Sequence, residues 1–351
     1  MYRFITTLLL AVTAMTMSFC KEATPVHTLK VTGLTCEYLT DPLSIENRHP
    51  RLAWKITDER QERNNQTQTA YQILVASSLE RLNSGKADIW DSGKVDSSQS
   101  THIEYNGSDI HSHSRYYWKV RIWNNYDEIS SWSAPAMWGT GIAKWIAGWI
   151  GDKPDEALRS YTEYVKAHSS GSDFNIAFWE NPPVLPSPLL RKSFTVPSEI
   201  KSATLYTSAI GYYEMWINGT KVGDQLQAPE WTDYSDHVQY QTYDVTGHVS
   251  QGDNVIGATL ADGWALGRLA GVKWMRSFPH RGFYALDRRL IAQLHIELAD
   301  GRTIVIPTDS SWKINREGHI RTADNFAGQT IDATKIQHGW NAPGFDDSTW
   351  E

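Results

Sequence analysis

The feature that most constrains this chain is a strict alternation of apolar and polar residues over short segments. In one segment every second residue is apolar: Leu290, Ala292, Leu294, Ile296 and Leu298. Such residues share one face of an extended strand. Asp300-Gly301 follows, and an apolar stretch returns at 303–306. Asp-Gly between two such segments predicts a tight β-hairpin. Asn218-Gly219 predicts another, because both turn residues need a positive φ. A chain built on this period is expected to be all-β.

The first part of the chain shows short strands at regular spacing. Turn pairs such as Asn106-Gly107 separate the segments that we expect to be strands, which are 29–32, 51–54, 70–77, 89–92, 101–105, 115–123 and 136–139. Seven short strands within 26–143 predict an immunoglobulin-like or fibronectin-type sandwich. In the segment 115–123, the residues expected to face the core are Tyr116, Trp118, Val120 and Ile122.

A different composition separates this domain from the next. Residues 144–186 contain a short helix-like segment at 157–168 and then a cluster of prolines that breaks regular structure. We interpret 144–186 as a connecting segment. From 187 to 351 the strand pattern returns, at 189–196, 202–209, 212–217, 239–245, 254–260, 290–298, 303–306 and 310–314. This predicts a second, jelly-roll-type β-sandwich that ends in a loop-like tail.

The N-terminus has the pattern of an export signal. Arg3 precedes an apolar stretch that is too short to span a bilayer as a mature helix, and Cys20 follows it directly. We interpret 1–20 as a lipoprotein-type signal peptide with Cys20 as the lipidation site, which predicts an exported, outer-membrane lipoprotein at the cell surface or in the periplasm. Simple cleavage and release into the periplasm is the alternative. The second cysteine, Cys36, is expected to be a small buried hydrophobe.

Aromatic residues suggest the kind of ligand. The chain has 16 Trp and 16 Tyr but only 9 Phe, and its net charge of −7 argues against nucleic acid as a partner. Two polar turns combine aromatic rings with a carboxylate, and the candidate sugar-binding residues there are Trp231, Asp233, Tyr234, Asp262 and Trp264. Asn218, Asp233 and Asp262 are candidate calcium ligands, and no other cofactor is expected. The alternative is that the tryptophans only pin their loops while the carboxylates cap turns. His280-Arg281 could meet an acidic partner surface.

Several motifs, in order along the chain, carry a resemblance. They include CEYLTDPL at 36–43, PRLAW at 50–54, SPLLRKSF at 187–194, WTDY at 231–234, YQTYDVT at 240–246 and DGW at 262–264. This ordered set resembles the N-terminal part of bacterial α-L-rhamnosidases of glycoside hydrolase family 78. Near 328–334 the sequence GQTIDAT departs from the pattern GExYDAR that the family often has.

The resemblance implies a modular enzyme. In the family, a fibronectin-like domain and a β-sandwich precede an (α/α)6 barrel that carries the catalytic carboxylates and acts on rhamnose-containing polysaccharides or glycosides. No catalytic residue is therefore expected in this chain, and Asp346-Asp347 is interpreted as a solvated loop pair. The fragment alone is expected to be inactive. Two other interpretations remain, a stand-alone carbohydrate-binding lipoprotein and a structural spacer that binds no sugar.

Overall fold

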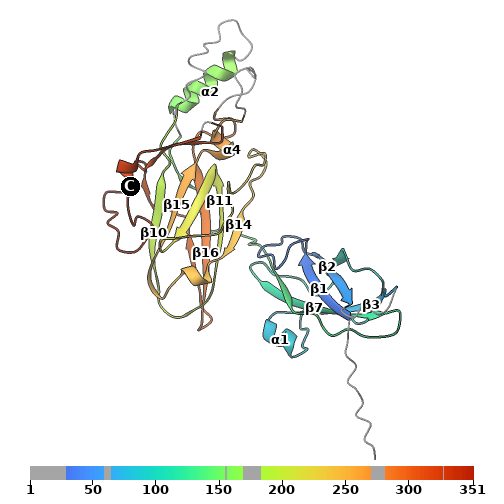
Figure 1. The fold of residues 1–351 in the computed structure, drawn as a ribbon. Helices are drawn as coiled ribbons and strands as arrows, with labels where there is room; N and C mark the ends of the chain where they lie inside the picture. Colours follow the sequence, from blue (N-terminus) through green and yellow to red (C-terminus); the bar gives the residue numbers. More distant parts are fainter. Residues whose placement is uncertain (1–28, 59–64, 155, 169–182, 270–280, 327) are drawn as a thin grey trace, which may run out of the picture.

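The computed structural model describes residues 29–58, 65–154, 156–168, 183–269, 281–326 and 328–351. These residues form two β-sandwiches joined by the connecting segment (Figure 1). The leader at 1–20, with Cys20, lies outside the described residues. Within the described ranges, no helix is both long and apolar enough to cross a membrane.

The first sandwich consists of two antiparallel sheets. One sheet has the order β1 (Leu29–Cys36), β2 (Arg51–Asp58) and β6 (Ile103–Glu104). The other has the order β4 (Trp90–Asp91), β3 (Gln68–Ala76), β7 (Arg115–Asn124) and β8 (Ala136–Gly139), and β5 (Val95–Asp96) also pairs with β3. A short helix, α1 (Leu79–Asn83), follows β3. The immunoglobulin-like sandwich expected from the strand spacing is confirmed.

The alternation in β7 decides which of its residues form the core. The four residues predicted to face inward are at most 3% exposed: Tyr116, Trp118, Val120 and Ile122. On the opposite face, the guanidinium of Arg121 lies 4.7 Å from the ring centroid of Trp132. This contact covers the aromatic ring while the charge stays near water. Cys36 is also buried, as predicted, and burial raises the pKa of its thiol to about 12.

The second sandwich has two antiparallel sheets of five strands each. The first has the order β13 (Thr220–Lys221), β12 (Tyr212–Ile217), β15 (Gly252–Ala261), β10 (Leu189–Val196) and β18 (Lys313–Asn315). The second has the order β14 (Gln241–Asp244), β11 (Ile200–Ile210), β16 (Arg289–Leu298) and β17 (Thr303–Pro307), and β9 (Ile150–Gly151) pairs with β16. Outside them lie the hairpin β19 (Ile320–Asp324) and β20 (Gly328–Ile331), the helices α2 (Glu156–His168) and α4 (Gly263–Leu266), and the 3-10 turns η1 (Thr246–His248) and η2 (Ala333–Lys335).

The strict alternation in the sequence forms the centre of this core. The five residues of the 290–298 series lie on β16 and are at most 1% exposed, between the two sheets. The expected Asn-Gly hairpin joins β12 to β13, with φ values of 52° at Asn218 and 80° at Gly219. Asp300-Gly301 turns the chain between β16 and β17, as predicted, but of these two residues only Gly301 has a positive φ, of 87°. The helix expected at 157–168 is α2.

The C-terminal tail is better packed than its loop-like sequence indicates. Trp340 and Trp350 are buried on the outer face of the first sheet, and the ring of Trp340 lies over Gly257, where a Cβ would come within 2.9 Å of it. The interpretation of Asp346-Asp347 as a solvated pair is correct only for Asp346. Asp347 pairs with the buried Arg191, because that guanidinium needs a counter-charge.

The two sandwiches meet at a small polar and aromatic junction. The hydroxyl of Tyr240, from the second sandwich, lies 3.2 Å from Ser44 Oγ of the first. Gly141 allows this approach, because a Cβ at that position would lie 2.0 Å from the same hydroxyl oxygen. An ion pair of 2.7 Å between Arg115 and Asp244 also crosses the junction.

Two histidines face each other across this junction. The ring centroids of His113 and His295 are 4.2 Å apart, and His113 Nδ1 lies 2.7 Å from the hydroxyl of Tyr206. Burial, together with a smaller effect of the neighbouring His113, lowers the pKa of His295 to about 4. Burial also lowers the pKa of His113, although the nearby carboxylate of Glu297 acts to raise it. Both rings are therefore neutral in the folded protein at neutral pH.

We predict that this pair makes stability depend on pH. A histidine whose pKa is lowered by folding binds fewer protons in the native than in the unfolded state. Its contribution is complete above a pH of about 6.5 and is lost as the pH falls toward about 4. In differential scanning calorimetry, the melting temperature should fall between pH 7.5 and pH 5, and His295→Gln should reduce that fall. The control, His338→Gln at an exposed histidine, should not. An equal fall in all three proteins would contradict the prediction.

Candidate functional site

Three aromatic rings form an exposed surface at one end of the second sandwich. Trp231 comes from the loop after β13, Trp264 from α4 and Phe326 from the turn between β19 and β20. The rings of Trp231 and Trp264 are stacked, with centroids 4.7 Å apart and an interplanar angle of 15°. Phe326 meets Trp264 edge-on at 6.1 Å. Because Trp231 is 51% exposed and Phe326 is 50% exposed, this aromatic surface presents ring faces to solvent.

The loop that carries Trp231 is held by local hydrogen bonds. Asp233 Oδ1 accepts the backbone N–H of Ser235 at 2.9 Å, which caps the turn. The hydroxyl of Tyr234 donates to the carbonyl of Glu230 at 2.8 Å, and its ring packs against Tyr284 at 5.4 Å. Asp233 and Tyr234 therefore shape the loop, and Trp231 is left to face solvent.

A groove of ≈ 370 Å³ opens beside Tyr234. Its lining combines the rings of Tyr234 and Tyr284 with charged side chains from α2 and β16, Arg159 and Arg289. The carboxylate of Asp287 accepts two hydrogen bonds from Arg289, at 2.6 and 3.0 Å. Aromatic walls beside fixed polar groups are typical of small-ligand sites, and the volume lies within their usual range.

Asp262 is placed differently from the other predicted site residues. Its side chain is 2% exposed and pairs with Arg281, and Arg288 lies 3.8 Å away. Burial raises the pKa of Asp262, and the two guanidinium groups oppose that rise. A carboxylate in this environment is not available to a sugar in solvent. Arg281, expected to meet an acidic partner surface, meets Asp262 of its own chain.

The same arginines hold the connecting segment against the sandwich. Arg288 pairs with Asp152 at 2.7 Å and donates to the carbonyl of Pro186 at 2.8 Å. Arg281 donates to the carbonyl of Pro183. The proline-rich stretch therefore has its carbonyl groups bonded to two buried guanidinium groups, and Asp262 and Asp152 supply the balancing charges.

The proposed calcium ligand set is wrong as a single site. Asn218 follows one end of β12, whereas Asp262 follows Ala261, which pairs with Tyr212 at the other end of that strand. Six strand residues separate the two positions, roughly 20 Å at ~3.3 Å per residue. Ligands of one calcium ion lie about 2.3–2.6 Å from it, so these two residues cannot share an ion. In the described ranges, no group of three or more His, Cys, Asp and Glu could hold a metal.

The structure thus joins some predicted residues and separates others. Trp231, Tyr234 and Trp264 lie at one end of the sandwich, with Asp233 in the same loop, while Asn218 donates a hydrogen bond to Asn254 of β15. Phe326 and Tyr284 were not predicted. Phe326 lies in a hairpin whose second strand, β20, is exposed at all four residues, so no alternation marked it.

The fold defines the chain as an immunoglobulin-like domain followed by a larger antiparallel β-sandwich. Residues 31–144 match the sequence model described as "Rha78A-like, N-terminal immunoglobulin domain". Residues 198–351 match the model described as "Alpha-L-rhamnosidase N-terminal domain". The chain thus matches, in order, two domain models from the N-terminal region of α-L-rhamnosidases.

Individual relatives agree with this assignment. The chain is 32% identical over 336 residues to an α-L-rhamnosidase of Alteromonas sp. (strain LOR), which covers 94% of this chain and 34% of the relative. A solved α-L-rhamnosidase of Dictyoglumus thermophilum superposes with a TM-score of 0.75 at 34% identity, over 92% of this chain and 33% of that one. That of Streptomyces avermitilis, complexed with L-rhamnose, has a TM-score of 0.78 at 27% identity, over 92% of this chain and 44% of that one. The chain thus spans about a third of the length of the curated relatives.

We predict that Asp262 is essential to the stability of the second sandwich. Asp262→Asn keeps the shape of the side chain but leaves Arg281 and Arg288 buried with less counter-charge. Breaking a buried pair in this way costs about 3–5 kcal/mol. Urea denaturation should show this loss in free energy of unfolding. Asp300→Asn, at an exposed hairpin ion pair, is the matched control and should change little. Equal stability of the two variants would contradict the prediction.

Proposed function

We propose that this chain is the non-catalytic N-terminal part of an enzyme that removes terminal α-L-rhamnose from glycans. The assignment to the N-terminal region of the family supports this proposal, as does coverage of only a third of the relatives' length. Among the residues of the site that the structure describes, Asp262, Asp287 and Asp233 do not form a pair of free carboxylates for acid–base hydrolysis. Asp262 and Asp287 are bonded to arginines, and Asp233 caps a turn. The catalytic barrel of the full enzyme is the partner that this proposal requires.

The accessory role that we propose is carbohydrate binding at the aromatic surface. The observation that carries it is the stacked pair of Trp231 and Trp264, which leaves Trp231 half exposed beside Phe326. A ring whose only task is to pin a loop is normally covered, whereas Trp231 and Phe326 are each about half exposed. Flat exposed rings can stack on the C–H faces of sugars. The groove beside Tyr234 extends this surface with polar groups.

Binding at the aromatic surface can be tested by titration. L-rhamnose and a rhamnose-containing oligosaccharide should change the tryptophan fluorescence of the chain. Trp231→Ala should weaken binding several-fold, since such ring contacts contribute about 0.5–1.5 kcal/mol. Titrations in EDTA and in calcium chloride should agree, because the described residues contain no group of three or more His, Cys, Asp and Glu that could hold a metal.

Trp149→Ala is the matched control, because Trp149 is 44% exposed but lies in the connecting segment. The chain should also release no product from an aryl α-L-rhamnoside. Absence of any fluorescence response would reject carbohydrate binding and leave the spacer interpretation. Hydrolysis by this chain alone would reject the non-catalytic assignment.

A separate observation supports a location for the protein. An apolar leader that ends at Cys20 is the pattern of an exported lipoprotein. We therefore propose attachment to the outer membrane through a lipid on Cys20, with the two sandwiches at the cell surface or in the periplasm.

In a Gram-negative host, labelling with an alkyne fatty acid should mark the protein in the membrane fraction. Cys20→Ser should abolish the label and release the protein from that fraction. The control Cys36→Ser, at the buried cysteine, should keep the label. A labelled Cys20→Ser variant would exclude lipidation at this residue.

A further inference from the structure

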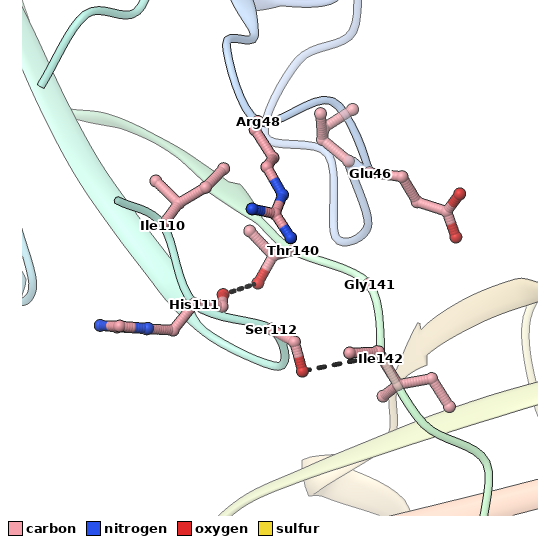
Figure 2. A pocket seen from close by; sticks show the side chains of 10 residues that line it. Glu46, Arg48, Ile110, His111, Ser112, Thr140, Gly141 and Ile142 are labelled. Atoms are coloured by element: carbon pink, nitrogen blue, oxygen red, sulfur yellow. Dashed lines mark hydrogen bonds between the residues drawn. The ribbon is translucent and has the colours of Figure 1, made fainter. Parts of the chain in front are cut away.

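A hollow of ≈ 310 Å³ lies in the first sandwich, where the chain leaves it for the connecting segment. Figure 2 shows it from close by, and the residues that matter here are Ile45, Arg48, Ile110, Ser112, Thr140 and Ile142. The aromatic surface lies in the other sandwich. Neither the resemblance nor the proposed function assigns a role to this hollow.

Arg48 supplies an unpaired charge to the hollow. Within the part of the chain that the structure describes, its guanidinium has no hydrogen bond or ion pair. Figure 2 shows it reaching across the hollow toward Thr140, while the carboxylate of Glu46 points the other way. Glu46, the nearest acidic residue in sequence, therefore does not pair with Arg48. Its carboxylate instead acts on the hydroxyl of Tyr240. Burial and this carboxylate raise the pKa of Tyr240 to about 12. Five N–H donors therefore remain available at one side of the hollow.

The rest of the hollow is fixed and partly apolar. Thr140 Oγ1 donates to the carbonyl of His111 at 2.6 Å and accepts the backbone N–H of Ser114 at 2.9 Å. Ser112 Oγ accepts the backbone N–H of Ala143 at 3.2 Å, and its own proton is left for a ligand. Three isoleucines in the lining add apolar surface. The ligand that fits has a negative group for Arg48, a hydroxyl for Ser112 and an apolar face.

We propose that this hollow binds one carboxylate-bearing sugar, a uronic acid residue of an acidic glycan. The planar guanidinium matches a carboxylate in a bidentate pair. The C–H face of the ring would lie on the isoleucines, and the volume, at the small end of ligand sites, suits a single ring. The proposal rests on the proposed function only in taking a glycan as the ligand. The hollow would be a second recognition site, separate from the aromatic surface, that recognises a negative charge.

The test compares sugars that differ only at C6. The full chain is titrated at low ionic strength with D-galacturonate and D-glucuronate, and with the neutral D-galactose and D-glucose, by ligand-detected NMR. At least one of the two uronates should bind. The corresponding neutral sugar should bind about tenfold more weakly. Arg48→Gln should weaken uronate binding by a similar factor, whereas Arg81→Gln, an exposed arginine of the same sandwich, should not. Sodium chloride at 0.5 M should weaken it as well.

Three outcomes would overturn the proposal. They are equal binding of uronate and neutral sugar, unchanged binding by Arg48→Gln, and acetate binding as tightly as the uronates, which would indicate a carboxylate site without sugar recognition. Trp231→Ala should leave the uronate titration unchanged, and Arg48→Gln should leave the L-rhamnose titration unchanged. Failure at the hollow is thereby distinguished from failure of the aromatic surface.

Discussion

The buried pairing of Asp262 with Arg281 and Arg288 is the interaction on which the rest of the second sandwich depends. Burying these charges is costly, and only their mutual attraction together with further hydrogen bonds compensates for it. The further bonds go to Asp152 and to the carbonyl groups of the proline-rich stretch. One set of charges thus fixes the connecting segment and the residue directly before α4. Because α4 carries Trp264, the position of the aromatic surface follows from a charge network inside the domain.

The aromatic residues of the chain divide into two groups by their surroundings. Most of the large rings fill cores, as Trp118 and Trp138 do in the first sandwich and Trp312 does in the second. Trp231 and Phe326 are instead half exposed and lie at the end of a rigid sandwich. Loops on a firm scaffold are the usual place for binding residues. Trp231 and Phe326 are therefore among the aromatic residues that core packing does not explain.

Sequence patterns predicted those parts of the structure that one strand or one turn determines. The inward face of β7, the alternation of β16 and the Asn218-Gly219 turn were all confirmed, because period and turn chemistry are local properties. The role of Asp262 was not predictable in this way, since its partners lie 19 and 26 positions later along the chain. The same holds for the calcium ligands predicted from the sequence. Asn218 and Asp262 both carry oxygen atoms that suit calcium, but they lie near opposite ends of β12. The sequence therefore predicted two of the loops that form the candidate site, but only some of its residues.

The contact between Gly141 and Tyr240 limits how the two domains can be exchanged between relatives. A side chain at residue 141 would occupy the space of the tyrosine hydroxyl, so any larger residue there acts as a wedge between the sandwiches. The close approach of the two sandwiches at this point thus depends on the missing side chain of Gly141 on one side and the phenol of Tyr240 on the other. Exchanging either sandwich with that of a relative would preserve this close approach only if the partner sandwich has a matching residue at the facing position. The two domains are in this respect a matched pair, although each has a core of its own.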